Sequence, residues 1–152
     1  MRREAVAPYL RDFDGWRRMG LGHFADSTVL WTLGDSGDWA QRFVERVPGL
    51  QLKSYGGSRA FASSRGVSSF KGFMALDPTD RRRGAQRACY VRIVVDGVLM
   101  YNGFDGEPLF DVMERVGRPV VAAAYFTPAQ QPVEFNRLAA ASCGTLALWT
   151  QR

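Results

Sequence analysis

An Asp-Gly pair between two strand-like runs constrains the fold of this chain more than any other local feature. The runs are Cys89–Val95 and Val98–Tyr101, and both are rich in β-branched and aromatic residues. Asp96 and Gly97 readily take the positive φ angles of a type I′ turn, whose twist matches that of the strands it joins. The sequence therefore predicts a β-hairpin over residues 90–101.

Further strands and helices are predicted on both sides of this hairpin. Short runs of β-branched, aromatic or apolar residues bounded by turn signals predict strands at residues 27–33, 50–55, 70–76, 119–126 and 145–150. Amphipathic spacing and capping residues predict helices at residues 8–19, 35–47, 107–116 and 128–141. This alternation favours an α+β or α/β fold, in which one mixed sheet with the 90–101 hairpin is covered by about four helices.

Length and composition favour one soluble domain. The chain has 152 residues, of which 46% are hydrophobic, enough for a single core. No apolar run approaches the roughly 18 residues of a membrane span, and Pro8 and Arg11 interrupt any export signal. Because two cysteines, Cys89 and Cys143, do not make a disulfide framework, we expect both to stay reduced in the cytoplasm.

The positive charge is carried almost entirely by arginine. The net charge is +5 and the isoelectric point is near 9.7, and only Lys53 and Lys71 among the 20 cations are lysines. Arginine forks onto phosphate or carboxylate groups, which suits nucleic acid or an acidic protein. A GC-rich genome produces the same arginine excess without selection for binding, and that alternative stays open.

Cations, aromatic rings and small residues concentrate between Ser54 and Arg87, where the only acids are Asp77 and Asp80. Cations displace the counterions of a phosphate backbone, and rings offer flat faces to bases. We expect electrostatic contacts at Arg59, Arg65, Lys71, Arg81, Arg82, Arg83 and Arg87, and ring contacts at Tyr55, Phe61 and Phe70. Residues 56–69 are expected to form a long mobile loop.

The residues that carry catalysis or bind metals are sparse. His23 is the only histidine, and it lacks the close spacing to Cys89 and Cys143 that metal sites use, so we expect no metal. Glycine motifs for dinucleotides and phosphates are absent, so we expect no cofactor. A nucleophile pair of Cys143 and His23 stays open beside the alternative that Cys143 packs as a small hydrophobe. No catalytic residue is assigned.

Two short stretches resemble known families. Phe61-Ala62-Ser63-Ser64 and the later Glu134 resemble elements of ADP-ribosyltransferases, which implies an intracellular toxin or effector enzyme. Residues 29–33, followed by a helix, a strand and Lys71-Gly72-Phe73, resemble the paired aromatic strands of RNA-recognition folds. That resemblance implies that Trp31 and Phe73 stack on bases, while inward packing is the alternative.

The sequence as a whole favours a small non-enzymatic binding or regulatory protein that engages nucleic acid or an acidic protein through its arginine- and aromatic-rich surface. The first alternative is a toxin-type enzyme, either ADP-ribosyltransferase-like or cysteine-based. The second is a structural or assembly protein, suggested by four tryptophans and the apolar run at residues 119–126. We expect no membrane partner, and the oligomeric state stays open.

Overall fold

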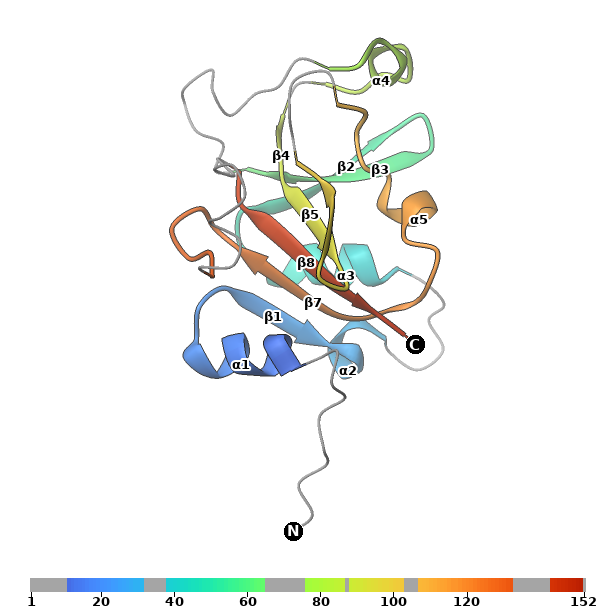
Figure 1. The fold of residues 1–152 in the computed structure, drawn as a ribbon. Coiled ribbons are helices and arrows are strands. Elements are labelled where there is room, and N and C mark those ends of the chain that lie inside the picture. The colour runs from blue at the N-terminus through green and yellow to red at the C-terminus, as the bar shows by residue number, and fades with distance from the viewer. Residues whose placement is uncertain are drawn as a thin grey trace.

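The computed structural model describes residues 11–31, 38–64, 76–86, 88–102, 107–132 and 143–151. Within these residues the strands form a five-stranded sheet and a three-stranded sheet, and helices pack against both (Figure 1). The mixed α+β content that the sequence predicts is confirmed, although the strands are divided between two sheets instead of one.

The larger sheet is mixed and carries most of the core. Its strands lie in the order β1 (His23–Asp26), β7 (Val120–Phe126), β8 (Thr145–Thr150), β5 (Arg92–Val95) and β6 (Val98–Tyr101). β5 and β8 are parallel and the other neighbours are antiparallel. The predicted hairpin is confirmed as β5 and β6, because Asp96 (φ 49°) and Gly97 (φ 81°) take the positive angles of its turn.

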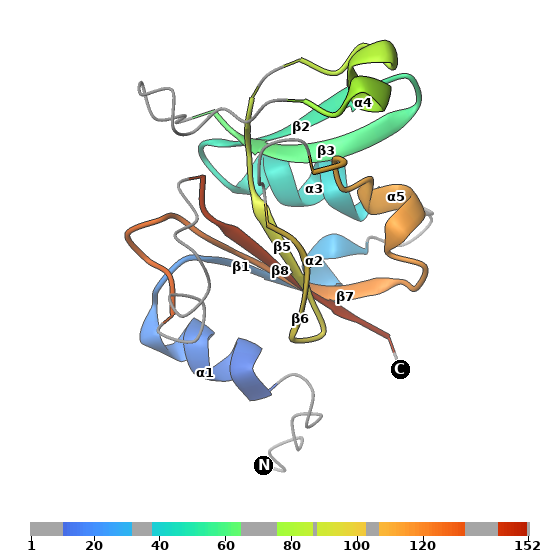
Figure 2. The ribbon, with the colours of Figure 1, turned by 45° about the horizontal axis from the view of Figure 1, so that its top comes forward.

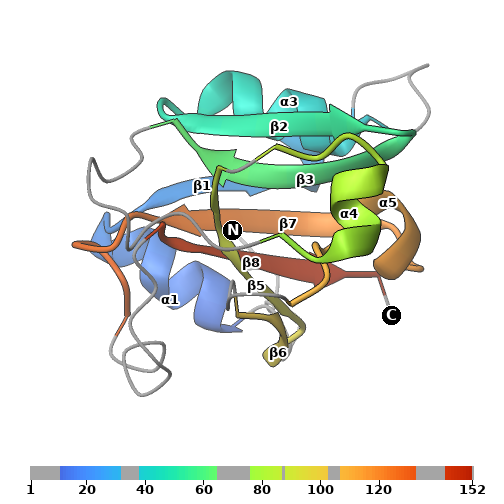
Figure 3. The same ribbon diagram turned by 90° about the horizontal axis from the view of Figure 1, so that it is seen from above.

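The smaller sheet corrects the expectation of a long loop at residues 56–69. Its strands are β2 (Leu50–Tyr55), β3 (Ser58–Ser63) and β4 (Cys89–Tyr90), and β2 pairs antiparallel with β3 (Figure 3). Gly56 and Gly57, with φ of 50° and 83°, form the tight turn between β2 and β3. The first half of the expected loop is therefore a strand, and residues 65–69 lie outside the described residues.

Side-chain alternation on β7 and β8 builds a core on each face of the larger sheet. On one face Tyr125 and Leu148 belong to a cluster that also includes Phe61 of the smaller sheet. On the other face Phe126 and Trp149 pack with the helix α1 (Arg11–Met19). The predicted strands at residues 119–126 and 145–150 are thus confirmed, and the sheet is covered on both sides (Figure 2).

A short helix occupies the first four residues of the strand predicted at residues 27–33, of which residues 32 and 33 lie outside the described residues. Asp26 Oδ1 accepts hydrogen bonds from the amide N–H groups of Thr28 and Val29, at 3.1 and 3.3 Å, and so begins the helix α2 (Ser27–Leu30). The capping interaction outweighs the strand preference of Thr28 and Val29. The strand in this part of the chain is β1, which ends at Asp26.

The other predicted helices are shorter than expected. The helix at residues 35–47 is α3 (Trp39–Arg46), which Asp38 caps by accepting the Gln41 amide N–H at 3.2 Å. The helix at residues 107–116 is reduced to α5 (Val112–Arg115). Residues 128–130 form turns, and residues 133–142 lie outside the described residues. The strand predicted at residues 70–76 also lies outside them, apart from Leu76.

Candidate functional site

Three consecutive arginines form an exposed turn at the end of the helix α4 (Pro78–Arg82). The Asp77 side chain caps the start of this helix by accepting a hydrogen bond of 2.8 Å from the Thr79 amide N–H. Pro78 follows in the first turn, where its lack of an amide N–H costs no helical hydrogen bond. Gly84, with φ of 90°, ends it. The side chains of Arg81–Arg83 are exposed, so this part of the predicted cationic surface does face solvent.

The carboxylates near this turn are engaged by the protein's own main chain. Asp80 is only 5% exposed, and its Oδ2 accepts the Leu109 amide N–H at 2.9 Å. Glu107 Oε1 accepts the Asn102 amide N–H at 3.1 Å. Between described residues no ion pair joins an acid to Arg81–Arg83, and Arg83 Nη1 donates instead to Ser58 Oγ at 3.3 Å. Within the described part of the chain these three arginines therefore have no ion-pair partner.

The bond between Leu109 and Asp80 also fixes α4 beside the segment that leads into α5. All three ribbon views place α4 and α5 on the same side of the molecule (Figures 1–3). This placement brings in two arginines that the sequence reasoning did not select, Arg115 and Arg118, and both are exposed. The signal available in the sequence was that two arginines flank Gly117, where the predicted helix at residues 107–116 ends.

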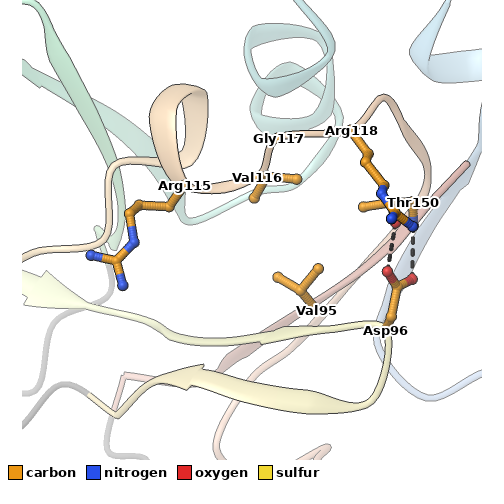
Figure 4. A pocket seen from close by; sticks show the side chains of 7 residues that line it. All are labelled: Val95, Asp96, Arg115, Val116, Gly117, Arg118 and Thr150. Carbon is orange, nitrogen blue, oxygen red and sulfur yellow. Dashed lines mark hydrogen bonds between the residues drawn. The ribbon is translucent and has the colours of Figure 1, made fainter.

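Arg115 and Arg118 border a cleft of about 280 Å³ between α5, the β5–β6 turn and the end of β8 (Figure 4). Its lining residues are Val95, Asp96, Arg115, Val116, Gly117, Arg118 and Thr150. Asp96 accepts hydrogen bonds from the amide N–H of Thr150, at 2.9 Å, and from its hydroxyl group. Asp96 forms no ion pair with either arginine, and the Arg115 guanidinium lies over the Phe110 ring, 5.7 Å from its centre.

We call five exposed arginines the basic face: Arg81 and Arg82 of α4, Arg83 directly after it, Arg115 at the end of α5, and Arg118 three residues beyond α5. Glu114, which is also exposed on α5, offsets part of this charge. Guanidinium groups present several N–H donors in a plane and match the oxygens of a phosphate or carboxylate. The basic face is therefore suited to an anion that offers several such groups.

The remaining predicted cations do not join this face in the described residues. Arg59 Nη2 lies 2.9 Å from Asp38 Oδ1 and its side chain is half-buried, so its charge is compensated within the protein. We therefore leave Arg59 out of the basic face. Arg65, Lys71 and Arg87 lie outside the described residues, as does the predicted ring contact Phe70.

The other two predicted ring contacts belong to the core, and the expectation that they stack on a partner is wrong. Tyr55 is 6% exposed and Phe61 is 2% exposed. The Phe61 ring packs against Trp39 of α3, with 5.9 Å between ring centres. Rings on a strand of a two-layer structure turn inward because the interior removes their large apolar surface from water.

Trp31, nominated by the resemblance to RNA-recognition folds, is also part of the packing. Its Nε1 donates a 2.6 Å hydrogen bond to the carbonyl oxygen of Val120, and its ring packs against the main hydrophobic cluster. The surrounding residues form α2 instead of the strand that the resemblance requires. Phe73, the second nominated ring, lies outside the described residues.

The two cysteines form a disulfide bond, Cys89 with Cys143. The expectation that both stay reduced is therefore wrong, because segments far apart in the sequence bring the two side chains together. Cys143 carries no thiol in this state, which removes the proposed nucleophile pair with His23. Glu134, on which the ADP-ribosyltransferase resemblance depends, lies outside the described residues.

Three buried tyrosines, Tyr55, Tyr90 and Tyr101, interact electrostatically with Asp80, and the sequence analysis did not identify them. Burial raises the pKa of Tyr90 to about 12, with a further contribution from the nearby Asp80. Burial also raises the pKa of Tyr55 and of Tyr101 above the usual tyrosine value, again with Asp80 as a secondary cause. The three phenols therefore stay protonated at neutral pH. The Tyr90 hydroxyl group donates a hydrogen bond to the Gln86 carbonyl oxygen.

Among the described residues no group of three or more His, Cys, Asp or Glu side chains is arranged to hold a metal ion. None of the helices in those residues combines the length and apolar character that crossing a membrane requires. Comparisons of the chain with protein-family models, with curated proteins and with solved structures found no match.

Proposed function

We propose that this protein binds nucleic acid by contacting its phosphate backbone through the basic face. The observation that carries the proposal is that α4, which leads into Arg83, and α5, which precedes Arg118, lie on the same side of the fold, and that Arg81–Arg83, Arg115 and Arg118 are all exposed. The acids beside them, Asp80 and Asp96, are occupied by hydrogen bonds to the main chain. Exposed arginines without an ion-pair partner are available to an external polyanion, and binding is favoured because it releases the polyanion's condensed counterions.

The surface around these arginines favours contact with phosphates over contact with bases. The exposed large hydrophobic side chains of the described residues are Met19, Leu21, Val98 and Met100, and none of them is aromatic. Stacking on bases requires exposed rings, whereas phosphate contacts require only cations. We therefore expect the affinity for nucleic acid to depend little on its base sequence. An acidic protein surface is the other anion that the same arginines fit.

The salt dependence of binding tests this proposal. The affinity of the full chain for a labelled DNA duplex is measured between low and moderate salt, and we expect log K to fall linearly with log salt concentration. The variant R81A/R82A is expected to bind more weakly, with a slope reduced by about 2, since each phosphate contact contributes about 0.9.

The matched control is R18A/R46A, which removes two exposed arginines from α1 and α3. We expect its slope to equal that of the unchanged protein. If both double variants reduce the slope equally, general positive charge accounts for binding and the basic face is not the site. If the duplex does not bind at low salt, the proposal fails and an acidic protein becomes the better candidate partner.

Two expectations from the sequence remain predictions beside this proposal. The enzyme alternative now depends on Glu134, and it predicts growth arrest of a host cell that the variant E134Q relieves. The cytoplasmic location also remains a prediction, and the disulfide bond between Cys89 and Cys143 weighs against it.

A further inference from the structure

The disulfide bond lies inside the protein and connects its two sheets. Cys89 begins β4 in the smaller sheet and is 1% exposed. Cys143, 7% exposed, stands two residues before β8 in the larger sheet. The two Cα atoms are 5.4 Å apart, although 54 residues separate them in the sequence. The bond therefore closes a long loop of the chain and crosses between two layers of the fold.

Strand pairing and hydrogen bonds with the surrounding residues hold both cysteines in place. Cys89 pairs with Ser63 of β3 in the smaller sheet. The Cys143 carbonyl oxygen accepts a hydrogen bond of 2.9 Å from the Tyr125 hydroxyl group. The next carbonyl oxygen, of Gly144, accepts the Arg92 amide N–H at 3.0 Å. The strands themselves thus place the two sulfur atoms together, within the Cα separation that a disulfide tolerates.

Burial distinguishes this bond from a redox-sensing pair. Sensor cysteines are exposed and have lowered thiol pKa values, so that oxidants and reductants reach them readily. Cys89 and Cys143 lie in the interior, and the sequence contains no third cysteine with which either could exchange. The bond therefore has the features of a permanent structural cross-link.

We infer that this chain acquires its disulfide as a step of folding in an oxidising compartment, by exchange with a disulfide-bonded oxidant. A thiolate of one cysteine attacks the oxidant's disulfide and forms a mixed disulfide, releasing one thiol of the oxidant. The second cysteine of the chain then displaces the oxidant's other sulfur. The chain loses two electrons and two protons, and the oxidant gains them, so that its disulfide becomes two thiol groups.

The partner that this inference names is a thiol–disulfide oxidoreductase, or a small disulfide such as oxidised glutathione. Disulfides persist in secreted, periplasmic and other oxidising locations and are rare in reducing cytosol. The inference predicts a different location from the cytoplasmic one expected from the sequence. It does not depend on the basic face, because nucleic-acid binding is measured separately from the oxidation state.

Expression of the full chain in two compartments tests the inference. One sample is made in the bacterial cytoplasm and the other is directed to the periplasm by a cleavable export signal. Free thiols are counted by alkylation with a maleimide-linked polymer under denaturing conditions, and the midpoint of thermal unfolding is measured. We expect no free thiols in the exported chain, two in the cytoplasmic chain, and a midpoint on the order of 10 °C lower in the latter.

The variant C89A/C143A serves as the matched control. We expect the same low midpoint for it from either compartment, and no response to reductant. Should that variant fail to fold, the midpoint of the unchanged exported protein with and without reductant decides the matter. Two free thiols in the exported chain, or equal midpoints for its reduced and oxidised forms, would overturn the inference.

Discussion

The amide N–H of Leu109 donates a 2.9 Å hydrogen bond to Oδ2 of the buried Asp80. This bond joins the turn that carries three arginines to the segment that leads into α5. Residues 107–111, which include Leu109, are not helical in the structure. The arrangement of the basic face therefore depends on a buried polar contact.

Removal of the Asp80 carboxylate is expected to destabilise the protein. The variant D80A leaves the Leu109 N–H buried without an acceptor, which costs about 1–3 kcal/mol of unfolding free energy. D80N retains an amide oxygen at the same place, so we expect a smaller loss. Urea unfolding measures both changes, with D12A on the exposed surface of α1 as a control that stays within about 0.5 kcal/mol. Equal stability of D80A and the unchanged protein would contradict this role.

Arg118 tests whether the cleft belongs to the nucleic-acid contact. If its guanidinium meets one phosphate, R118A lowers the slope of log K against log salt by about 1. R118K keeps the positive charge, so we expect the slope to persist while the affinity falls with the loss of the planar donor group. Fluorescence titration at several salt concentrations measures both. A slope unchanged by R118A would show that Arg118 does not contact a phosphate.

Gly144 and Gly117 form a natural pair for testing backbone packing. A Cβ atom at Gly144 would lie 2.6 Å from the Phe126 carbonyl oxygen, and the residue has φ of 91°. A Cβ at Gly117 meets nothing within 4 Å. We expect G144A to reduce the unfolding free energy by several kcal/mol and G117A to change it by less than about 1 kcal/mol. Similar denaturation curves for the two variants would contradict the close packing at β8.

The buried tyrosines predict a loss of stability at alkaline pH. The pKa of Tyr90 rises from the model-compound value of 10.0 to about 12 in the folded protein. A raised folded-state pKa contributes stability that is complete below pH 10.0 and is lost as the pH rises towards about 12. Unfolding free energies across this range, with tyrosinate absorbance followed in parallel, measure the effect.

Replacement of the phenol gives the control for the alkaline transition. Y90F cannot ionise at this position, so its stability is expected to decline less steeply with rising pH than that of the unchanged protein. The variant also loses the hydrogen bond to the Gln86 carbonyl oxygen, which lowers its stability at all pH values. An identical pH dependence for both proteins would show that Tyr90 ionisation does not contribute.

Several elements could be predicted because neighbouring residues alone specify them. The Asp96-Gly97 turn requires only two residues that tolerate positive φ between β-prone runs. The runs at residues 50–55, 119–126 and 145–150 are strands in the structure as well, because β-branched and apolar residues favour extended, buried segments. The local signal was insufficient at residues 27–30, where a side-chain cap competes with strand propensity.

Little of the candidate site could be predicted in this way. The exposed turn at Arg81–Arg83 was found from its charge alone. The burial of Tyr55 and Phe61 depends on the second sheet, and the charge of Arg59 is compensated by Asp38 from another element. Such contacts join residues that are distant in the sequence, so no local pattern indicates them.

The amino-acid sequence by itself determined the type of many elements and the arginine-borne positive charge, since both follow from residue identity and short-range backbone preferences. Only the tertiary structure decided which charges remain uncompensated, which rings are buried, and that Cys89 bonds to Cys143. The physical reason is that burial, ion pairing and cross-linking are properties of groups brought together in space, and the packing of the two sheets sets those distances.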